Sequence, residues 1–258
     1  MKTSPSILKP HNQATVKKIC FCGLCFLFVS LSNCLNAQNN GLQKQQTDSS
    51  IYLKVYYQSV AMDDFNTAIE ALHYVLASDP EKYSNWKDTL ALLYVRNNSF
   101  QQANVLSSAL LDTKGYTDLR MEIRAICAKA LQQPAEAIDA YSILYSKTNK
   151  IAYGFEELRL QYSIRRLTET IATGNSLLQN IPPTNKDFVS VVKADGKTPQ
   201  QVSLKAAVCN LLGLAYADLK DKTNAKEQFE SALKENPDFE LAKNNLAVTE
   251  SAVDNAKK

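Results

Sequence analysis

Residues 206–239 read AAVCNLLGLAYADLKDKTNAKEQFESALKENPDF, and this stretch of 34 residues decides the fold. Its apolar residues recur every three to four positions, which is the period of an amphipathic helix, in two successive blocks. Small residues stand where the backbones of two antiparallel helices would nearly touch, and large ones stand beside them: Gly213, Ala225 and Ala232 are small, and Tyr216 and Phe229 are large. The stretch therefore predicts a helical hairpin.

The same pattern recurs along the chain with a nearly constant period. The second helix of each block can be aligned on a small or aliphatic residue, which gives the anchors Ala68, Ala103, Ala137, Ile171 and Ala225. Successive anchors lie 35, 34, 34 and 54 residues apart, and the last spacing equals one 34-residue unit plus 20 inserted residues. One hairpin cannot bury its apolar face alone, so each hairpin is expected to pack on the next.

These blocks resemble tetratricopeptide repeats, whose helix-turn-helix unit is 34 residues long. The motifs that carry the resemblance are Leu212-Gly213, Ala215-Tyr216, Ala225, Phe229, Ala232-Leu233 and Asn236-Pro237. The resemblance implies an all-α, right-handed superhelical stack of antiparallel helix pairs, with repeats at about 49–82, 84–117, 118–151, 152–183 and 206–239. Gly174 lies inside the second helix of the fourth copy. The fourth copy is therefore either a degenerate repeat or a non-repeat helix pair that continues the stack.

Two further segments complete the predicted domain of residues 49–254. The insertion at about 184–203 contains Phe188–Val192, which favours a strand, then the turn signal Asp195-Gly196, and Gln200–Ser203 as a short returning strand. This β-hairpin is either a plain surface loop, or a flap on the groove or a strand edge offered to a partner. Residues 240–254 are predicted to form a capping helix over the open end of the stack.

The first 37 residues are predicted to be a secretory signal peptide, followed by a flexible lead-in over residues 38–48. Four lysines precede an apolar run from Ile19 to Leu31, and a polar segment ends at Ala37. Thirteen helical residues are too short to cross a hydrocarbon core of about 30 Å. Cleavage after Ala37 is the first interpretation, and a lipoprotein signal ending at Cys34 is the alternative, because Leu31–Cys34 resembles a lipobox. Either signal predicts an exported protein in the periplasm, or on the periplasmic face of the outer membrane, of a bacterium.

Charge and residue content exclude several classes of function. Without the four leader lysines, 29 − 4 = 25 basic residues face 26 acidic ones, so electrostatic binding of nucleic acid or anionic lipid is not expected. Only Cys127 and Cys209 lie outside the leader, and both are expected to be buried thiols. His73 is the one histidine after the leader, so neither a catalytic set nor a metal site is predicted. The glycines are isolated and form no phosphate-binding loop, so no cofactor site is predicted.

The resemblance also implies where a partner would bind. In tetratricopeptide repeats the first helices of successive pairs line a concave groove that holds protein or peptide ligands. By that resemblance the groove of this chain draws on Tyr57, Asp88, Leu92, Arg96, Glu122, Ile126, Lys129, Asn210 and Leu214. The leading hypothesis is a non-catalytic exported scaffold for protein or peptide partners. The alternatives are a lipid-anchored component of outer-membrane assembly, with membrane attachment only through Cys34, and a solute- or glycan-binding helical repeat protein.

Overall fold

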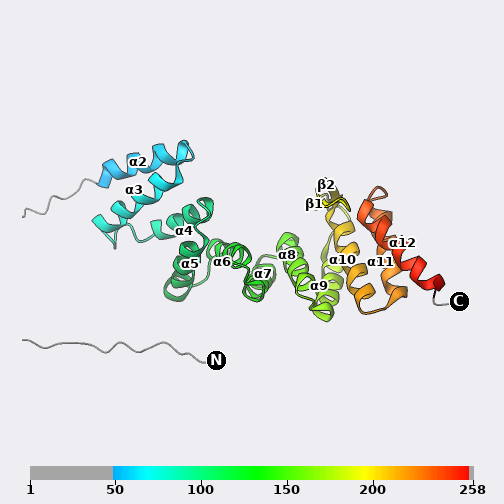
Figure 1. Cartoon of the computed structure of the whole chain (residues 1–258). Coiled ribbons are helices and arrows are strands. Elements are labelled where there is room, and N and C mark those ends of the chain that lie inside the picture. The colour runs from blue at the N-terminus through cyan, green and yellow to red at the C-terminus, as the bar shows by residue number, and fades with distance from the viewer. Residues whose placement is uncertain (1–48, 256–258) are drawn as a thin grey trace, which may run out of the picture. The chain divides into compact units, whose positions relative to one another are not determined.

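The computed structural model of the chain describes residues 49–255, which form eleven helices and one two-stranded sheet (Figure 1). The predicted signal peptide, lead-in and Cys34 lie outside these residues. In chain order the elements are α2 (Ser49–Ala61), α3 (Phe65–Ser78), α4 (Trp86–Arg96), α5 (Phe100–Lys114), α6 (Asp118–Ala130), α7 (Pro134–Thr148), α8 (Ile151–Ser163), α9 (Leu167–Asn180), β1 (Phe188–Val192), β2 (Pro199–Ser203), α10 (Leu204–Asp218), α11 (Lys222–Glu235) and α12 (Glu240–Asn255).

Short polar residues and backbone breakers set the ends of these helices. The Asp64 side chain caps α3 by accepting a hydrogen bond from the Thr67 backbone N–H, and Asp221 caps α11 in the same way. Pro134 occupies the first turn of α7, where its missing N–H would have no helical partner. Gly115 ends α5 with a φ of 80°, a conformation that glycine adopts without strain. The helices therefore begin and end where the sequence places its breakers.

The helices pack as antiparallel pairs, and each helix contacts the one that follows it. Four of the five anchor residues, namely Ala68, Ala103, Ala137 and Ala225, are completely buried between the helices, whereas Ile171 is half-buried. A methyl group at these positions lets the two backbones approach, which is the packing that the periodicity predicts. The all-α fold class is confirmed.

Glycine permits close helix contacts in the fourth pair and its neighbour. A Cβ atom on Gly174 of α9 would lie 2.6 Å from Cδ2 of Leu212 on α10, and one on Gly213 would lie 2.5 Å from the Phe229 ring. Gly174 is thus tolerated inside a helix because α10 packs directly against it. The departure of the fourth copy from the sequence pattern has a packing cause.

The insertion forms the predicted hairpin. Strands β1 and β2 pair in antiparallel fashion, with Phe188 opposite Ser203 and Val192 opposite Pro199. The hairpin packs on the helices through Val202, which is completely buried against α10 and its neighbours. This burial explains how so short a sheet is stable, since an isolated hairpin is marginal in water.

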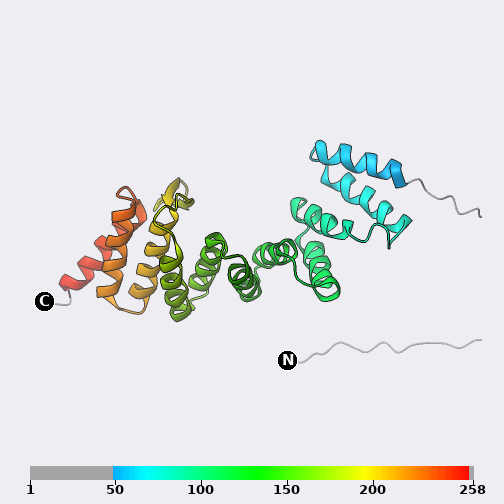
Figure 2. The ribbon, with the colours of Figure 1, turned by 180° about the vertical axis from the view of Figure 1, so that it is seen from behind.

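The last helix, α12, packs on α10 and α11, and Figures 1 and 2 show the three helices side by side from opposite directions. Ala242 is completely buried at this contact, and an ion pair of 2.8 Å joins Glu250 to Lys226 of α11. Val248 of the same helix is exposed. Across residues 49–255, none of the helices has the length and apolar character needed to span a membrane.

Candidate interaction surfaces

Side-chain bonds tie the first helices of successive pairs to one another. The guanidinium of Arg120 on α6 donates from Nε and Nη2 to the two carboxylate oxygens of Asp88 on α4, at 2.7 and 2.8 Å. A third donor, Nη1, reaches the carbonyl oxygen of Gly115 at 2.8 Å. Only 8% of the Arg120 side chain and 24% of the Asp88 side chain are exposed. This bidentate pair braces α4 against α6.

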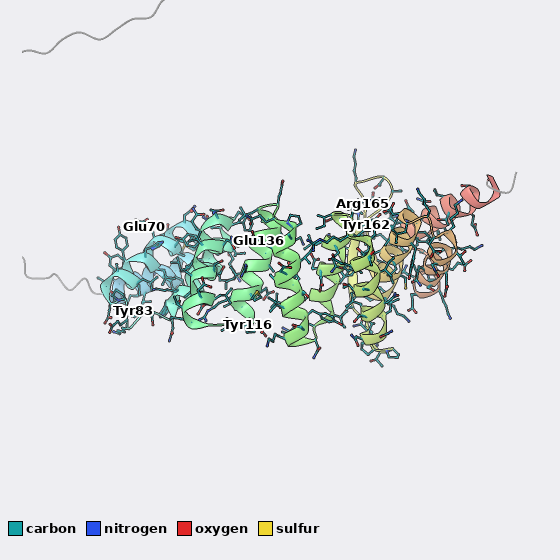
Figure 3. All side chains as sticks on the ribbon, turned by 90° about the horizontal axis from the view of Figure 1, so that it is seen from below. Glu70, Tyr83, Tyr116, Glu136, Tyr162 and Arg165 are labelled. Carbon is teal, nitrogen blue, oxygen red and sulfur yellow. The ribbon has the colours of Figure 1, made fainter. Side chains whose placement is uncertain are left out.

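Similar contacts continue along α6, α8 and α10. Lys129 of α6 pairs with Glu156 of α8 at 2.5 Å, and Glu156 also accepts from Arg159 at 2.7 Å. Arg165, just after α8, pairs with Asp218 of α10 at 2.7 Å, and Figure 3 shows it beside Tyr162. Burial, together with Asp218, raises the pKa of Tyr162 to about 12, so its hydroxyl stays protonated.

The structure places the nine predicted groove residues in three kinds of environment. Tyr57, Arg96 and Lys129 are exposed, and the Arg96 guanidinium lies 5.8 Å from the centre of the Phe65 ring. The half-buried residues are Asp88, Leu92, Glu122, Ile126 and Leu214. Asn210 is buried and accepts a hydrogen bond of 3.0 Å from Asn245 of α12. In the described part of the chain no hydrogen bond or ion pair joins two of the nine.

One of the three exposed residues, Tyr57, belongs to an aromatic cluster that joins the first helix pair to α4. Tyr57 is 59% exposed, and its ring makes edge contacts with Tyr56 and with Trp86 of α4, at centroid distances of 5.0 and 6.2 Å. On the same helix Tyr52 stacks on Tyr74 of α3 at 4.7 Å. Exposed aromatic side chains offer large contact areas at little entropic cost, which suits them to protein contacts.

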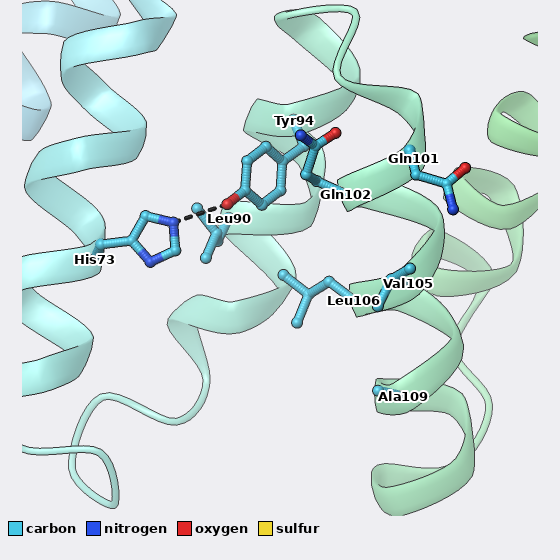
Figure 4. Close-up of a pocket in the computed structure, with 8 residues that line it drawn as sticks. All are labelled: His73, Leu90, Tyr94, Gln101, Gln102, Val105, Leu106 and Ala109. Atoms are coloured by element: carbon cyan, nitrogen blue, oxygen red, sulfur yellow. Dashed lines mark hydrogen bonds between the residues drawn. The ribbon is translucent and has the colours of Figure 1, made fainter. Parts of the chain in front are cut away.

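An apolar pocket of about 450 Å³ lies between α3, α4 and α5, and Figure 4 shows it in close-up. At its edge Nε2 of His73 lies 2.8 Å from the hydroxyl oxygen of Tyr94, in a hydrogen bond. Burial raises the pKa of Tyr94. The pocket is lined by His73, Leu90, Tyr94, Gln101, Gln102, Val105, Leu106 and Ala109.

The sequence does not reveal this pocket. In the sequence, His73 stands out only as the one histidine after the leader, and the structure shows that its side chain is exposed. The signal that could have found the pocket is Val105, an apolar residue of α5 that is 61% exposed.

A second cavity, of about 510 Å³, separates β1 from α8. Its walls are Ala152, Phe155, Glu156 and Arg159 on one side, and Asp187, Phe188, Val189, Ser190 and Leu204 on the other. This cavity has a mixed lining, because charged side chains of α8 face a strand with mostly apolar side chains. The hairpin thus faces the first helix of the fourth pair, and the space between them is open.

No cluster of three or more His, Cys, Asp or Glu side chains with metal-binding geometry occurs among residues 49–255. The predicted burial of the two thiols is confirmed, and it raises the pKa of both Cys127 and Cys209 to about 11. Buried, protonated thiols are poor nucleophiles and poor metal ligands.

Comparisons with known proteins agree with this architecture. Residues 206–239 match the family model described as "Tetratricopeptide repeat", while the curated proteins contain no match to the sequence. The structure is similar to that of YrrB, described as a TPR protein with an unusual peptide-binding site, with a TM-score of 0.56 and 14% identity over 80% of this chain and 95% of YrrB. It is also similar to MamA, with a TM-score of 0.55 and 16% identity over 72% of this chain and 91% of MamA. The chain is thus a stack of helix pairs with the tetratricopeptide-repeat fold, and its repeat at residues 206–239 matches that family in sequence.

Proposed function

We propose that the chain is a non-catalytic, exported scaffold that binds protein or peptide partners along the face formed by its first helices, α2, α4, α6, α8 and α10. The observation that carries the proposal is the line of side-chain bonds between α4, α6, α8 and α10, which fixes these helices beside one another. Such a braced face is preorganised, so a ligand loses little free energy in ordering it. The peptide-binding site in the description of YrrB supports the same role.

The exposed groups on this face indicate what a ligand would contact. Tyr57 supplies an aromatic surface at one end, and Arg96 and Lys129 supply positive charge further along. Arg96 is the better ion-pairing group for a ligand, since Lys129 already contacts Glu156. A peptide that carries an apolar side chain and an acidic side chain fits this arrangement. The bonded Asp88 and the buried Asn210 are better placed to hold the helices than to touch the ligand.

A peptide-display selection against the full chain tests the proposal. Selected peptides are measured by fluorescence anisotropy against the wild type, Tyr57→Ala and Arg96→Ala, with Lys147→Ala on the second helix α7 as the matched control. We expect each first-helix variant to weaken binding by about tenfold, which corresponds to about 1.4 kcal/mol, and the control to bind like the wild type. Failure to select any peptide, or selected peptides that bind all variants equally, would argue against the proposed face.

Export is tested separately on the protein recovered from cell fractions of a bacterium that expresses the full chain. Intact mass spectrometry distinguishes the two predicted signals, because plain cleavage leaves Gln38 as the first residue, whereas lipid modification leaves an acylated Cys34. We expect the Gln38 form in the periplasmic fraction. An uncleaved chain in the cytoplasmic fraction would rule out both interpretations of the leader.

A further inference from the structure

The two outer edges of the hairpin differ in whether the protein covers them. On β2 the backbone N–H of Ser203 points to the side-chain oxygen of Asn236, at 3.4 Å. The Gln200 amide donates to the carbonyl oxygen of Asp238 at 2.6 Å and accepts from the Glu240 backbone N–H at 3.2 Å. The loop between α11 and α12 therefore covers the β2 side of the sheet.

The outer edge of β1 is open. Backbone bonds from Leu204 to Asp187 and from Lys193 to Thr198 show that the odd-numbered residues of β1 bond to β2. Because bonding direction alternates along an antiparallel strand, Phe188, Ser190 and Val192 direct their N–H and C=O groups away from β2. Within residues 49–255 none of these six groups has a hydrogen-bond partner.

Natural sheets usually protect such an edge with a charge, a proline or a bulge. The run Phe188–Val192 has none of these, and the side chains at its two ends are 63% and 51% exposed. The cavity of about 510 Å³ between β1 and α8 is lined by Phe188, Val189 and Ser190 of this strand. A second strand that pairs with this edge would lie about 4.8 Å from β1, which is the spacing of neighbouring strands in a sheet.

The sequence of this edge is complementary to itself. In an antiparallel pairing centred on Ser190, Asp187 lies opposite Lys193 of a second copy, and Phe188 lies opposite Val192. Ser190 then faces its own counterpart. Pairs of opposite charge and pairs of an aromatic with a β-branched side chain are both favourable across strands. The centre of the pairing, Ser190, is a residue whose backbone groups point outward. Every outward-facing donor and acceptor of the three even-numbered residues would be paired.

We propose that two copies of this chain associate through their β1 edges, which join the two hairpins into a four-stranded antiparallel sheet about a two-fold axis at Ser190. A strand contact of this size is far below the roughly 1,000 Å² of a stable interface, so the dimer is expected to be weak and concentration-dependent. The association is isologous and closes on itself, which favours a dimer over a fibre.

Cross-linking at the two-fold axis tests the proposal on the full chain, with Cys20, Cys22, Cys25 and Cys34 replaced by serine. Cα atoms in a directly bonded antiparallel pair lie about 5.5 Å apart, within the range that a disulfide bridges. Under mild oxidation we expect Ser190→Cys to give a disulfide-linked dimer. Mass spectrometry should identify a cross-linked peptide in which position 190 of one copy is joined to position 190 of the other. The control is Gln201→Cys, at the exposed position opposite Ser190 on β2, which would not meet its own copy.

Sedimentation velocity between about 5 and 500 µM supplies the second readout, because a small interface dissociates at low concentration. Ser190→Pro removes an outward N–H without breaking a bond inside the hairpin, and Gln201→Pro does the same on the covered side. We expect the first variant to lose the dimer and the second to keep it. A monomer at every concentration, with no cross-link in the Ser190→Cys variant, overturns the proposal, and so does a dimer that Ser190→Pro leaves intact. A monomer that binds a labelled peptide copying Asp187–Lys193 also overturns it, since the edge would then serve another protein.

Discussion

The pair between Asp88 and Arg120 allows a brace to be distinguished from a ligand-binding group. Replacing Asp88 with Asn keeps the shape of the side chain but removes its charge and one of the acceptors that the guanidinium uses. Hydrogen bonds to charged groups contribute about 1.5–3 kcal/mol each, and breaking a fully buried ion pair costs about 3–5 kcal/mol. The Asp88 side chain is 24% exposed, so water can partly replace the lost interaction with Arg120. We therefore expect Asp88→Asn to lower the free energy of unfolding by about 2–3 kcal/mol.

Urea unfolding of the full chain, followed by circular dichroism, measures this change. Repeat stacks are stabilised by contacts between neighbours, so hydrogen exchange of α4 and α6 should also accelerate, while that of α11 should not. The matched control is Glu169→Gln, which breaks an exposed pair with Arg166 of 3.3 Å and should change stability by less than about 0.5 kcal/mol. The double variant Asp88→Asn, Arg120→Met should be more stable than Asp88→Asn alone, because no buried charge is left without a partner.

Two results would refute the reasoning. If Asp88→Asn changes stability no more than Glu169→Gln does, the pair behaves as an exposed one and does not brace α4 against α6. If the variant is as stable as the wild type but binds selected peptides much more weakly, Asp88 is a ligand-binding residue, as the resemblance implies. Stability and binding must therefore be measured on the same variant.

Buried groups give three further predictions. Burial raises the pKa of Glu157 above its ordinary value, so folding favours the protonated carboxyl. The wild type therefore loses stability as pH rises from the ordinary pKa through the raised pKa of the folded chain. Glu157→Gln should raise the melting temperature at pH 7 but not at pH 4. Gly213→Ala should cost about 1–3 kcal/mol in urea unfolding through overpacking, because the added Cβ meets the Phe229 ring, and Phe229→Leu in the same chain should recover part of the loss. Iodoacetamide at pH 8 should leave Cys127 and Cys209 unmodified in the folded chain, by peptide mass spectrometry; rapid modification would contradict their burial.

The sequence could predict the helix pairs because their packing depends on residues with a fixed spacing. The anchors Ala68, Ala103, Ala137 and Ala225 are completely buried as their period requires. The hairpin was predictable for a similar local reason, since a β-branched run is followed by a turn signal in consecutive residues. Local spacing and local propensity thus accounted for the elements and their order.

The bonds between repeats were not predictable, because they join residues far apart in the chain. Asp88 and Arg120 are separated by 32 residues, and Lys129 and Glu156 by 27. Whether two such side chains meet depends on how each pair is rotated on the next, which the period of the apolar residues does not specify. The pocket beside His73 is formed by three different helices and depends on the same rotation.

The connection between hairpin and helix argues against a plain surface loop. Ser203 is the last residue of β2 and also the N-cap of α10, where its hydroxyl accepts from the Ala206 backbone N–H at 3.2 Å. Val202, one residue earlier, is completely buried in the core below. The strand therefore leads into the helix of the best-matched repeat without a flexible joint. A loop that served only to connect α9 with α10 would need neither this junction nor a strand such as β1 with an unprotected edge. A pairing surface needs both, because it must be held in a fixed direction.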